Sequence, residues 1–564
     1  MKACWLFLLF VFGLWARRGV AAALSAPCQL RETSYGSVCV CNSSYCDYLD
    51  QPILSDNAQI VVISSSKNGL RFKQANASFL DKEALEVQDH QWIDENFVAD
   101  SIIVEQNKAW LQFANVPQRF AFNVSIKTVQ LTVKRELRYQ KITNFGGAFT
   151  GSVSHILKQL PIDLQDHVYR SYFHADGIGY NSIRMSIGAS DFDLQPWAYN
   201  ELPRNDPSLS NFSTLDSRDL QKIEQLKRLK VVAQLNDLKI MAAAWSAPTW
   251  MKSNERWTGF GQLKSEYYQA WADYHLKFLE LMQSKNMPVW AISTGNEPLN
   301  GVIGFIFIHF MSMGWTPWQQ AIWLGDYLGP TIKKSKQSHV LIFGNDDQRY
   351  TYPSWFRKMR ASRSNALDYL DGLAVHWYWD EIFGPKLIDD AHTEMPNKLL
   401  LNTESCIGDK PWQTHGPELG NWGRGESYMR AYIQDLLHNF NGWLDWNLVL
   451  DEQGGPNYVH NYVDAPVIVN TTSRTEFYKQ PIYYAIGHFS KFLPEQSVRI
   501  EARTNETESF AQLSAVGFQR PDGTVALILY NGENLPVNVA LNDSQRGAFN
   551  LRLPARSWHT VVYK

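Results

Sequence analysis

Two glutamates are the residues of this chain best placed to do chemistry together. Glu297 follows the apolar run Val289–Ser293, and Glu404 follows the apolar run Leu399–Leu401. Either residue alone could be a surface group or an ion-pair partner. If both runs are strands of one parallel barrel, however, both carboxylates lie at the end of the barrel where catalysis occurs. Two carboxyl groups about 5 Å apart can cleave a glycosidic bond with retention of configuration, one as nucleophile and one as proton donor.

The middle of the chain carries the elements that would position this pair. From Asn144 to Leu450, short apolar runs alternate with amphipathic segments of helical length, such as Ser265–Met282, Trp318–Lys334 and Glu426–Phe440. Eight candidate strands end at Gly146–Gly147, Ser186–Asp191, Ala244–Trp245, Ser293–Glu297, Phe343–Asp346, Val375–Tyr378, Leu401–Glu404 and Asp445–Asn447. This alternation predicts a (β/α)8 TIM barrel, an α/β fold. No glycine-rich phosphate motif follows the first strand, which disfavours an open nucleotide-binding sheet.

Polar or aromatic residues follow strand after strand, and we expect them to line one cleft at the carboxyl ends of the strands. They are Asp191–Phe192, Trp245–Ser246, Asn296–Glu297, Asp346–Asp347, His376–Tyr378, Glu404 and Trp446–Asn447. Asn296 can hydrogen-bond the sugar hydroxyl next to the reacting carbon.

The two ends of the chain have a different pattern. Alternating segments occur at Ile60–Ser64, Ala109–Phe113, Val525–Tyr530, Val537–Leu541 and Trp558–Tyr563, with turn residues between them. Such alternation predicts antiparallel sheet. A chain of 564 residues also exceeds one hydrophobic core, so we expect two or three folded units.

The N-terminus indicates export. A basic start, the apolar run Cys4–Trp15 and small residues up to Ala26 predict a cleaved signal peptide over residues 1–25, with an uncleaved anchor as the alternative. Four closely spaced cysteines follow and predict disulfides rather than a zinc site, because no histidine lies near them. The N-x-S/T sequons, candidates for glycosylation, are Asn42, Asn76, Asn123, Asn211, Asn470, Asn505 and Asn542.

Composition excludes some partners. The net charge of −3, without clustered basic residues, disfavours nucleic acid. We find no metal-binding constellation and no nucleotide loop, so we predict no cofactor.

Several motifs resemble one enzyme family. The run STGNEPLNG, Ser293–Gly301, resembles the acid/base segment of clan A glycoside hydrolases. The ordered set resembles the glucosylceramidases of glycoside hydrolase family 30 over nearly all of the chain from Cys28 onward. It comprises CVCNSSYC (39–46), NFGGAFT (144–150), WSAPTWMK (245–252), VHWYWD (375–380), GWLDWNL (442–448), GGPNYVHNYVDAP (454–466) and FYKQPIYYAIGHFSKFLPE (477–495).

The resemblance implies roles for individual residues. Glu297 would be the acid/base and Glu404 the nucleophile of a retaining β-glucosidase that hydrolyses glucosylceramide to glucose and ceramide. Residues with implied roles in glucose binding are Asp191, Trp245, Asn296, Trp446 and Asn461. Arg184, His376 and Tyr378 would line or support the nucleophile. The implied disulfides are Cys28–Cys39 and Cys41–Cys46.

The resemblance also implies a domain plan. Residues 26–51 with 448–479 would form a small antiparallel sheet domain, 52–139 with 497–564 an immunoglobulin-like β domain, and 140–447 with 480–496 the catalytic barrel. It implies action in the lysosome, with secretion as the alternative, and dependence on a sphingolipid activator protein. Two alternatives are a hydrolase of xylan or β-glucan and a catalytically silent glycolipid-binding protein. The pair of glutamates speaks against the second.

One segment after Glu297 is unusually apolar for a barrel loop. Gly301–Trp315 reads GVIGFIFIHFMSMGW, which is too short to span a membrane. It is either a buried segment or a hydrophobic rim that contacts lipid tails or a bilayer. In the second case, replacing Phe305, Phe307 and Phe310 with Ser should reduce hydrolysis of liposomal lipid far more than hydrolysis of a soluble aryl glucoside. Cys406, two residues past Glu404, is predicted to be a buried packing thiol.

Overall fold

The computed structural model describes residues 25–54, 57, 59–79, 126–303, 308–505 and 513–564. Residues 1–24 of the expected signal peptide, the sequon at Asn123, the segment Ala109–Phe113 and the side chains of Phe305 and Phe307 lie outside this part of the chain. Within the described residues, helices long and apolar enough to cross a bilayer are absent.

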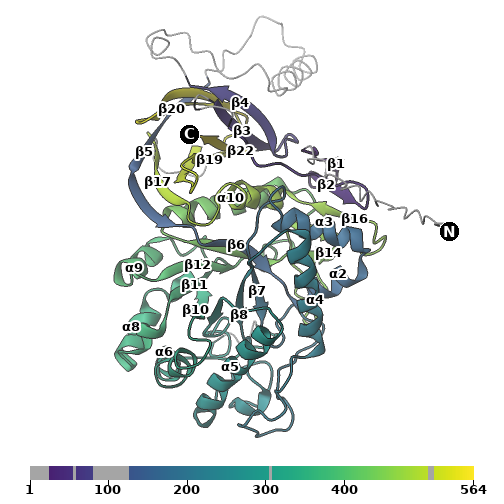
Figure 1. Cartoon of the computed structure of the whole chain (residues 1–564), viewed down its shortest axis with the longest axis vertical. Coiled ribbons are helices and arrows are strands. Elements are labelled where there is room, and N and C mark those ends of the chain that lie inside the picture. The colour runs from purple at the N-terminus through teal and green to yellow at the C-terminus, as the bar shows by residue number, and fades with distance from the viewer. Residues whose placement is uncertain (1–24, 55–56, 58, 80–125, 304–307, 506–512) are drawn as a thin grey trace, which may run out of the picture.

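The centre of the molecule is a closed barrel of eight parallel strands (Figure 1). In chain order they are β6 (Asn144–Ala148), β7 (Ser182–Ser186), β8 (Lys239–Ala243), β9 (Ala291–Ser293), β10 (Leu341–Gln348), β11 (Gly372–His376), β12 (Leu399–Glu404) and β13 (Gly442–Asn447). Each strand coincides with one predicted from the sequence, so the predicted fold class is confirmed. Side chains from six strands fill the barrel interior, namely Met241, Ala291, Phe343, Ala374, Leu401 and Leu444.

Helices cover the outside of the barrel and bury their apolar faces against it. They are α2 (Gly151–Gln159), α3 (Ile162–Phe173), α4 (Ser217–Val232), α5 (Tyr268–Ser284), α6 (Pro317–Ile322), α7 (Gly329–Lys333), α8 (Ser354–Ser362), α9 (Lys386–Glu394), α10 (Trp422–Leu437) and α11 (Pro481–Ser490). A π-helical stretch, Trp323–Leu328, joins α6 to α7, and short 3-10 turns lie at Thr249–Met251, Ser265–Tyr267, Arg349–Thr351 and Ala366–Tyr369. The side chain of Thr316 caps the start of α6.

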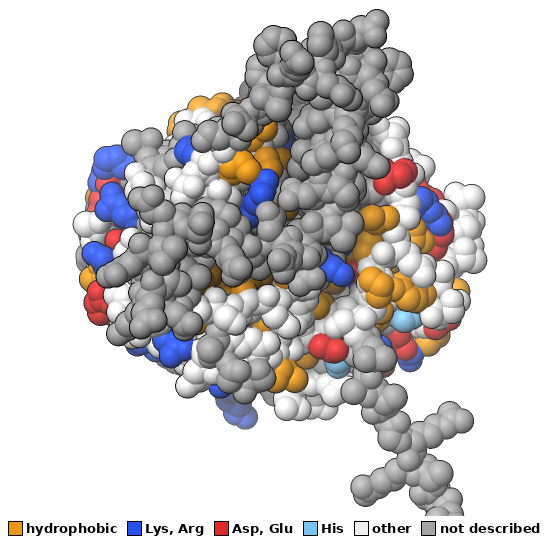
Figure 2. Space-filling view, turned by 90° about the horizontal axis from the view of Figure 1, so that it is seen from above, with side chains coloured by type: hydrophobic (Ala, Val, Ile, Leu, Met, Phe, Trp, Pro, Cys, Tyr) orange, Lys and Arg blue, Asp and Glu red, His pale blue; other side chains and the backbone are white. Residues whose placement is uncertain are grey.

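The two ends of the chain meet in a nine-stranded sheet above the barrel, with α10 between them (Figure 1). Its order is β21 (Gly547–Leu553), β20 (Val537–Asp543), β5 (Thr128–Lys141), β17 (Val498–Thr504), β18 (Leu513–Gln519), β19 (Val525–Asn531), β22 (Ser557–Tyr563), β3 (Gln59–Ser66) and β4 (Lys73–Ser78). The β5–β20 pairing is parallel, unlike the antiparallel pattern expected from the sequence. On this end of the molecule, the basic and acidic side chains that can be seen are interspersed among polar and apolar ones (Figure 2).

A five-stranded sheet lies beside the barrel. Its order is β1 (Leu30–Glu32), β2 (Ser37–Asn42), β16 (Glu476–Lys479), β15 (Val467–Val469) and β14 (Val449–Asp451). Here too one pairing, β14 with β15, is parallel rather than antiparallel. A parallel pair needs a long crossover connection, and residues 452–466 supply it. The domain boundaries given above stay predictions.

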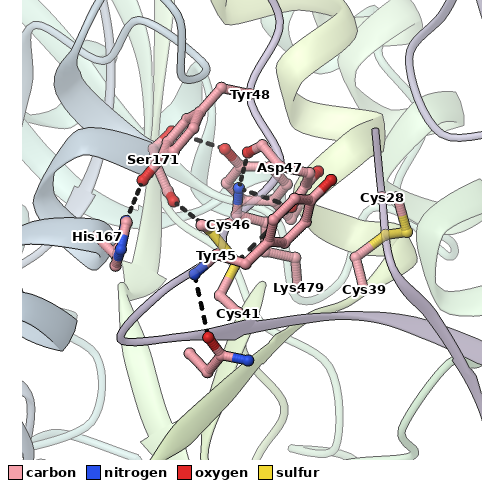
Figure 3. Close-up of a disulfide and its surroundings, with 12 residues drawn as sticks. Cys28, Cys39, Cys41, Tyr45, Cys46, Asp47, Tyr48, His167, Ser171 and Lys479 are labelled. Atoms are coloured by element: carbon pink, nitrogen blue, oxygen red, sulfur yellow. Dashed lines mark hydrogen bonds and ion pairs between the residues drawn. A yellow bond between two sulfur atoms is a disulfide. The ribbon is translucent and has the colours of Figure 1, made fainter. Parts of the chain in front are cut away.

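The disulfides Cys28–Cys39 and Cys41–Cys46 tie the N-terminal segment together (Figure 3). Beside them the Lys479 ammonium lies 3.1 Å from the Asp47 carboxylate and over the ring of Tyr48. Tyr48 in turn is hydrogen-bonded to His167 of α3 at 2.6 Å. The small sheet is therefore fixed to a helix on the outside of the barrel by polar contacts.

Candidate active site

The two predicted catalytic carboxylates meet at the carboxyl end of the barrel. Glu404 is the last residue of β12, the seventh barrel strand, and Glu297 follows β9, the fourth. One oxygen of each carboxylate and one ring nitrogen of His376 all lie within 4.8 Å of one another. Both glutamates are largely buried, with 9% and 7% of their surfaces exposed. Because charged groups interact strongly at such spacing and burial, the two carboxylates titrate as a pair.

Glu404 is held by two donors. Arg184 Nη1 donates to one carboxylate oxygen at 2.5 Å, and the Tyr378 hydroxyl donates to the other at 2.7 Å. Burial raises the pKa of Glu404, as does the charge of Glu297, against the opposing effect of the His376 and Arg184 cations. Hydrogen bonds to both oxygens fix the orientation of the carboxylate.

Glu297 is held by a different set of groups. Gln348 Nε2 donates to Oε1 at 2.7 Å, Asn300 Nδ2 donates to Oε2 at 2.5 Å, and His376 Nδ1 lies 3.0 Å from Oε1. Burial favours the neutral acid, but the contacts with His376 and Asn300 hold the pKa of Glu297 below its ordinary value. The resemblance places His376 with the nucleophile, whereas in the structure its direct hydrogen bond is to Glu297.

The backbone at Glu297 is strained. Its φ is 44°, in the left-handed region that is uncommon for a glutamate. The Glu297 N–H donates to the carbonyl oxygen of Asp346 at 2.9 Å, which holds this turn against the end of β10. A backbone conformation of this kind costs about 1–3 kcal/mol. Such residues are found mainly at functional sites, where the surrounding structure holds them in place.

The residues with implied roles in glucose binding surround the pair. Trp245 and Trp446 stack with ring centres 5.5 Å apart, and the Arg184 guanidinium lies over both rings. Arg184 Nη2 also donates to the side-chain oxygen of Asn296 at 2.7 Å, which leaves the amide NH2 of Asn296 to face a ligand. These contacts come from four strands, so the barrel ends do bring the predicted residues together.

Asp191 and Asn461 complete the set from two loops. Asn461 lies in the crossover 452–466 and donates a hydrogen bond to Asp191. Burial, together with the charges of Glu404 and Glu297, raises the pKa of Asp191 to about 8. Asp191 is therefore a neutral acid below that pH and can donate as well as accept hydrogen bonds.

Gln348 and Asn300 belong to the site although neither the resemblance nor the pattern gives them a role, whereas the strand-end pattern already placed Asp346–Asp347 in the expected cleft. Asp347 lies next to Glu297, and burial with that neighbouring charge raises the pKa of Asp347 to about 7. The sequence signal for Asp346 and Asp347 is their position at the end of a predicted strand. Hydrogen bonds to Glu297 from Gln348 and Asn300 depend on backbone turns that periodicity does not encode.

Cys406 packs against Tyr378, near Glu404. It is buried, and its sulfur lies 3.5 Å from the Tyr378 hydroxyl. Burial raises the pKa of the Cys406 thiol well above its usual range, so the unreactive thiol form prevails. Cys406 and Tyr378 also line a cavity of about 510 Å³, together with residues such as Asp409 and Arg424.

The apolar segment after Glu297 divides into two parts. Met311, Met313 and Trp315 are buried, whereas Ile303 is 63% exposed. The described residues thus contain both a buried segment and an exposed apolar side chain.

Comparison with known proteins extends these observations. Residues 142–493 match the glycosyl hydrolase family 30 TIM-barrel domain, and residues 496–561 match the glycosyl hydrolase family 30 beta sandwich domain. Lysosomal acid glucosylceramidase of Mus musculus is 32% identical, over 98% of this chain and 99% of that protein. Putative glucosylceramidase 3 of Caenorhabditis elegans is 34% identical, over 93% and 92%.

A solved structure agrees on the fold. The structure of SrfJ from Salmonella typhimurium has a TM-score of 0.73 at 22% identity and covers 90% of this chain and 99% of that one. The family models together match most of the chain, and full-length relatives exceed 30% identity. The chain is therefore a glycoside hydrolase and belongs to glycoside hydrolase family 30.

Proposed function

We propose that this glycoside hydrolase cleaves the β-glucosidic bond of glucosylceramide with retention of configuration, through a covalent glucosyl-enzyme intermediate. The observation that carries the mechanism is the spacing of Glu297 and Glu404, whose nearest oxygens lie within 4.8 Å. Retaining enzymes keep their carboxyl groups about 5–5.5 Å apart, whereas inverting enzymes need about 6.5–9.5 Å to admit a water. The names of the full-length relatives support the substrate.

In the first step, Glu404 attacks the anomeric carbon and Glu297 protonates the leaving oxygen. The bond between the carbon and the aglycone breaks as the ester bond to Glu404 forms. Glu404 suits the nucleophilic role because Arg184 and Tyr378 fix both of its oxygens. Asn296 and Asp191 would hold sugar hydroxyls, with Trp245 and Trp446 against the ring.

Glu297 needs a proton for this step, although its hydrogen bonds favour the ionised form. His376 can supply the proton, because its Nδ1 is 3.0 Å from Glu297. Burial disfavours the imidazolium, but the surrounding carboxylates raise the pKa of His376 to about 10. Transfer from Nδ1 to Glu297 leaves a neutral imidazole and a neutral acid, and no further proton is required.

In the second step, Glu297 takes a proton from water as the water oxygen attacks the anomeric carbon and releases Glu404. The esterified Glu404 has lost its charge, and loss of this neighbouring negative charge lowers the pKa of Glu297, so Glu297 is ionised and able to accept the proton from water. The recovered proton returns to the pair formed by Glu297 and His376, and the cycle closes.

Azide distinguishes the two glutamates. Glu404→Gly with azide should give the α-glucosyl azide, and Glu297→Ala should give the β-glucosyl azide, because azide replaces a different group in each variant. A 2-deoxy-2-fluoro-β-glucosyl fluoride should label Glu404. Each variant alone should lose about 10³-fold or more in kcat, whereas Glu280→Gln on the exposed face of α5 should not. A label on another residue, or products of the opposite configuration, would refute the assignment.

We also propose that the barrel mouth contacts a lipid bilayer. Large apolar side chains are exposed on loops that follow five barrel strands, namely Leu202, Phe260, Ile303, Ile382 and Trp412. Large exposed apolar groups at one end of a molecule are typical of membrane or protein contact sites. Such contact would bring the headgroup of a membrane lipid to Glu297 and Glu404.

Substrates in two physical forms test this contact. Ile382→Ser with Trp412→Ser should lower hydrolysis of glucosylceramide in liposomes about 10-fold or more and leave hydrolysis of a soluble aryl β-glucoside within twofold. Val231→Ser, an exposed apolar residue of α4 on the outside of the barrel, is the matched control. Equal losses on both substrates would argue against bilayer contact.

We further propose that the protein acts in the lysosome and reaches it by the secretory pathway. Two disulfides support an oxidising route, and the mouse relative is lysosomal by name. Dependence on a sphingolipid activator protein stays a prediction from the resemblance.

A further inference from the structure

Asp346 connects the two halves of the catalytic pair. It is fully buried at the end of β10. Its Oδ2 accepts a hydrogen bond from Arg184 Nη2 at 2.9 Å, and its Oδ1 lies 3.1 Å from His376 Nε2. The Thr403 hydroxyl also donates to Oδ1, at 2.6 Å. Of these three partners, Arg184 holds Glu404 and His376 holds Glu297.

The backbone of β10 is irregular at Asp346, and this irregularity sets the direction of the Asp346 side chain. β10 contains a bulge between Asn345 and Asp347, where its register with β11 shifts. Asn345 and Asp346 both have positive φ, 72° and 56°. Asn and Asp tolerate this region better than most residues, and a bulge changes the direction of a strand's side chains. The local sequence therefore allows Asp346 to point at Arg184 and His376 instead of following the regular alternation.

We propose that Asp346 is a positioning residue that holds both catalytic carboxylates in their working states at once. It acts on Glu404 through Arg184 and on Glu297 through His376. This inference rests on the proposed roles of the two glutamates and adds a third buried carboxylate that touches neither the sugar nor the reacting atoms.

The connection to Glu404 depends on the shape of the guanidinium. Arg184 donates hydrogen bonds from Nη2 to Asp346 and Asn296, and from Nη1 to Glu404. Because the guanidinium is planar and rigid, an anchor at Nη2 fixes the direction of Nη1. Without the Asp346 charge, the guanidinium would lose this anchor, and Glu404 would lose the orientation of its strongest donor.

The connection to Glu297 depends on the two nitrogens of His376. By accepting the Nε2–H, Asp346 leaves Nδ1 facing Glu297 and stabilises the imidazolium. The charged groups around His376 are Glu297 after β9, Asp346 and Asp347 on β10, Glu404 on β12 and Arg184 on β7. Asp346 itself stays ionised, because Arg184 and His376 outweigh its burial and lower its pKa.

The test is Asp346→Asn, which keeps the size of the side chain and tolerates the same φ. On an aryl β-glucoside with a poor leaving group, we expect kcat/KM to fall about 100-fold, the order expected for misplaced catalytic groups. The basic limb of its pH profile should move at least one unit lower, because the imidazolium loses a stabilising charge. On a dinitrophenyl glucoside, which needs no proton, the loss should be smaller but present, since Arg184 is still unanchored. His376→Asn should spare that second substrate.

Asp435→Asn is the matched control. Asp435 is also a buried carboxylate paired with an arginine, Arg349 at 2.8 Å, and bonded to Asn402, but it does not reach the glutamates. It should lower thermal stability without moving the basic limb. Rates are referred to active sites counted with the fluoroglucosyl label. An Asp346→Asn variant with the pH profile and the per-site rate of the control would overturn the proposal.

A second variant covers the case in which Asp346→Asn does not fold. Thr403→Val removes one hydrogen bond to Asp346 at nearly constant volume, and we expect a loss of about 10-fold, greater on the poor leaving group. Wild-type kinetics in Thr403→Val would then overturn the proposal. All variants are assayed on any glycoside that the wild type cleaves, so a wrong substrate assignment would show in the wild type and not in this comparison.

Discussion

At the scale of single residues, the site works by giving each carboxylate its own donors. Glu404 receives Arg184 and Tyr378, while Glu297 receives Gln348, Asn300 and His376. Two like charges so close would otherwise disfavour each other's ionisation. The separate donors hold both carboxylates in fixed orientations at this short spacing, as the proposed nucleophile and proton donor would need.

Tyr378 offers a direct test of this division. Its hydroxyl lowers the pKa of Glu404, so Tyr378→Phe should raise that pKa. As the proposed nucleophile, Glu404 must be ionised to attack, and the acidic limb of kcat/KM should therefore move about one unit higher, with a loss of about 10-fold below that limb. Tyr172→Phe, which loses a buried hydrogen bond to the Leu448 carbonyl oxygen, should leave the limb in place. A pH–rate profile of each variant decides, and an unshifted acidic limb in Tyr378→Phe would refute this account.

At the scale of elements, the sequence was sufficient where a pattern repeats. Eight apolar runs with polar residues at their ends predicted the eight barrel strands, and those ends contain the residues of the site. Asn461 could come only from the resemblance, because it lies in a loop between two strands of another sheet.

What the pattern could not predict has a common cause. Alternation of apolar and polar residues reports which face of a strand is buried, not the direction of its neighbour, so the parallel pairs β14–β15 and β5–β20 were unexpected. The bulge at Asn345–Asp347 and the left-handed Glu297 depend on contacts between strands. Both features bear on the catalytic pair.

At the scale of the whole molecule, the barrel and the nine-stranded sheet meet across a buried polar junction. His488 of α11 lies 2.9 Å from both Ser65 and Thr560 through its two ring nitrogens. His559 of β22 makes similar contacts with Ser64 and Ser557 at 2.8 Å. Burial lowers the pKa of both histidines, that of His559 to about 3, so both are neutral in the folded protein.

This junction predicts that acid weakens the fold. The unfolded chain binds protons on these histidines below pH about 6.5 and the folded chain does not, so stability falls as pH decreases from there. His559→Gln should shrink the difference in unfolding free energy between pH 7 and pH 5 by about 2 kcal/mol. Denaturant unfolding at the two pH values measures it, with His309→Gln at the surface as control. An unchanged difference in His559→Gln would show that the junction does not sense pH.

The order of strands in the nine-stranded sheet has a consequence for biosynthesis. β22, the last strand in chain order, lies between β19 and β3, with Ser557 paired to Ser66. During translation, β3 and β4 emerge long before their partner and would expose an unpaired edge while the barrel is made. A nonsense mutation just before Ser557 would leave the first strands without their neighbour, although every residue proposed for glucoside cleavage would be present. Such a truncated chain is expected to fail in the cell through misfolding and degradation, and not through defective chemistry.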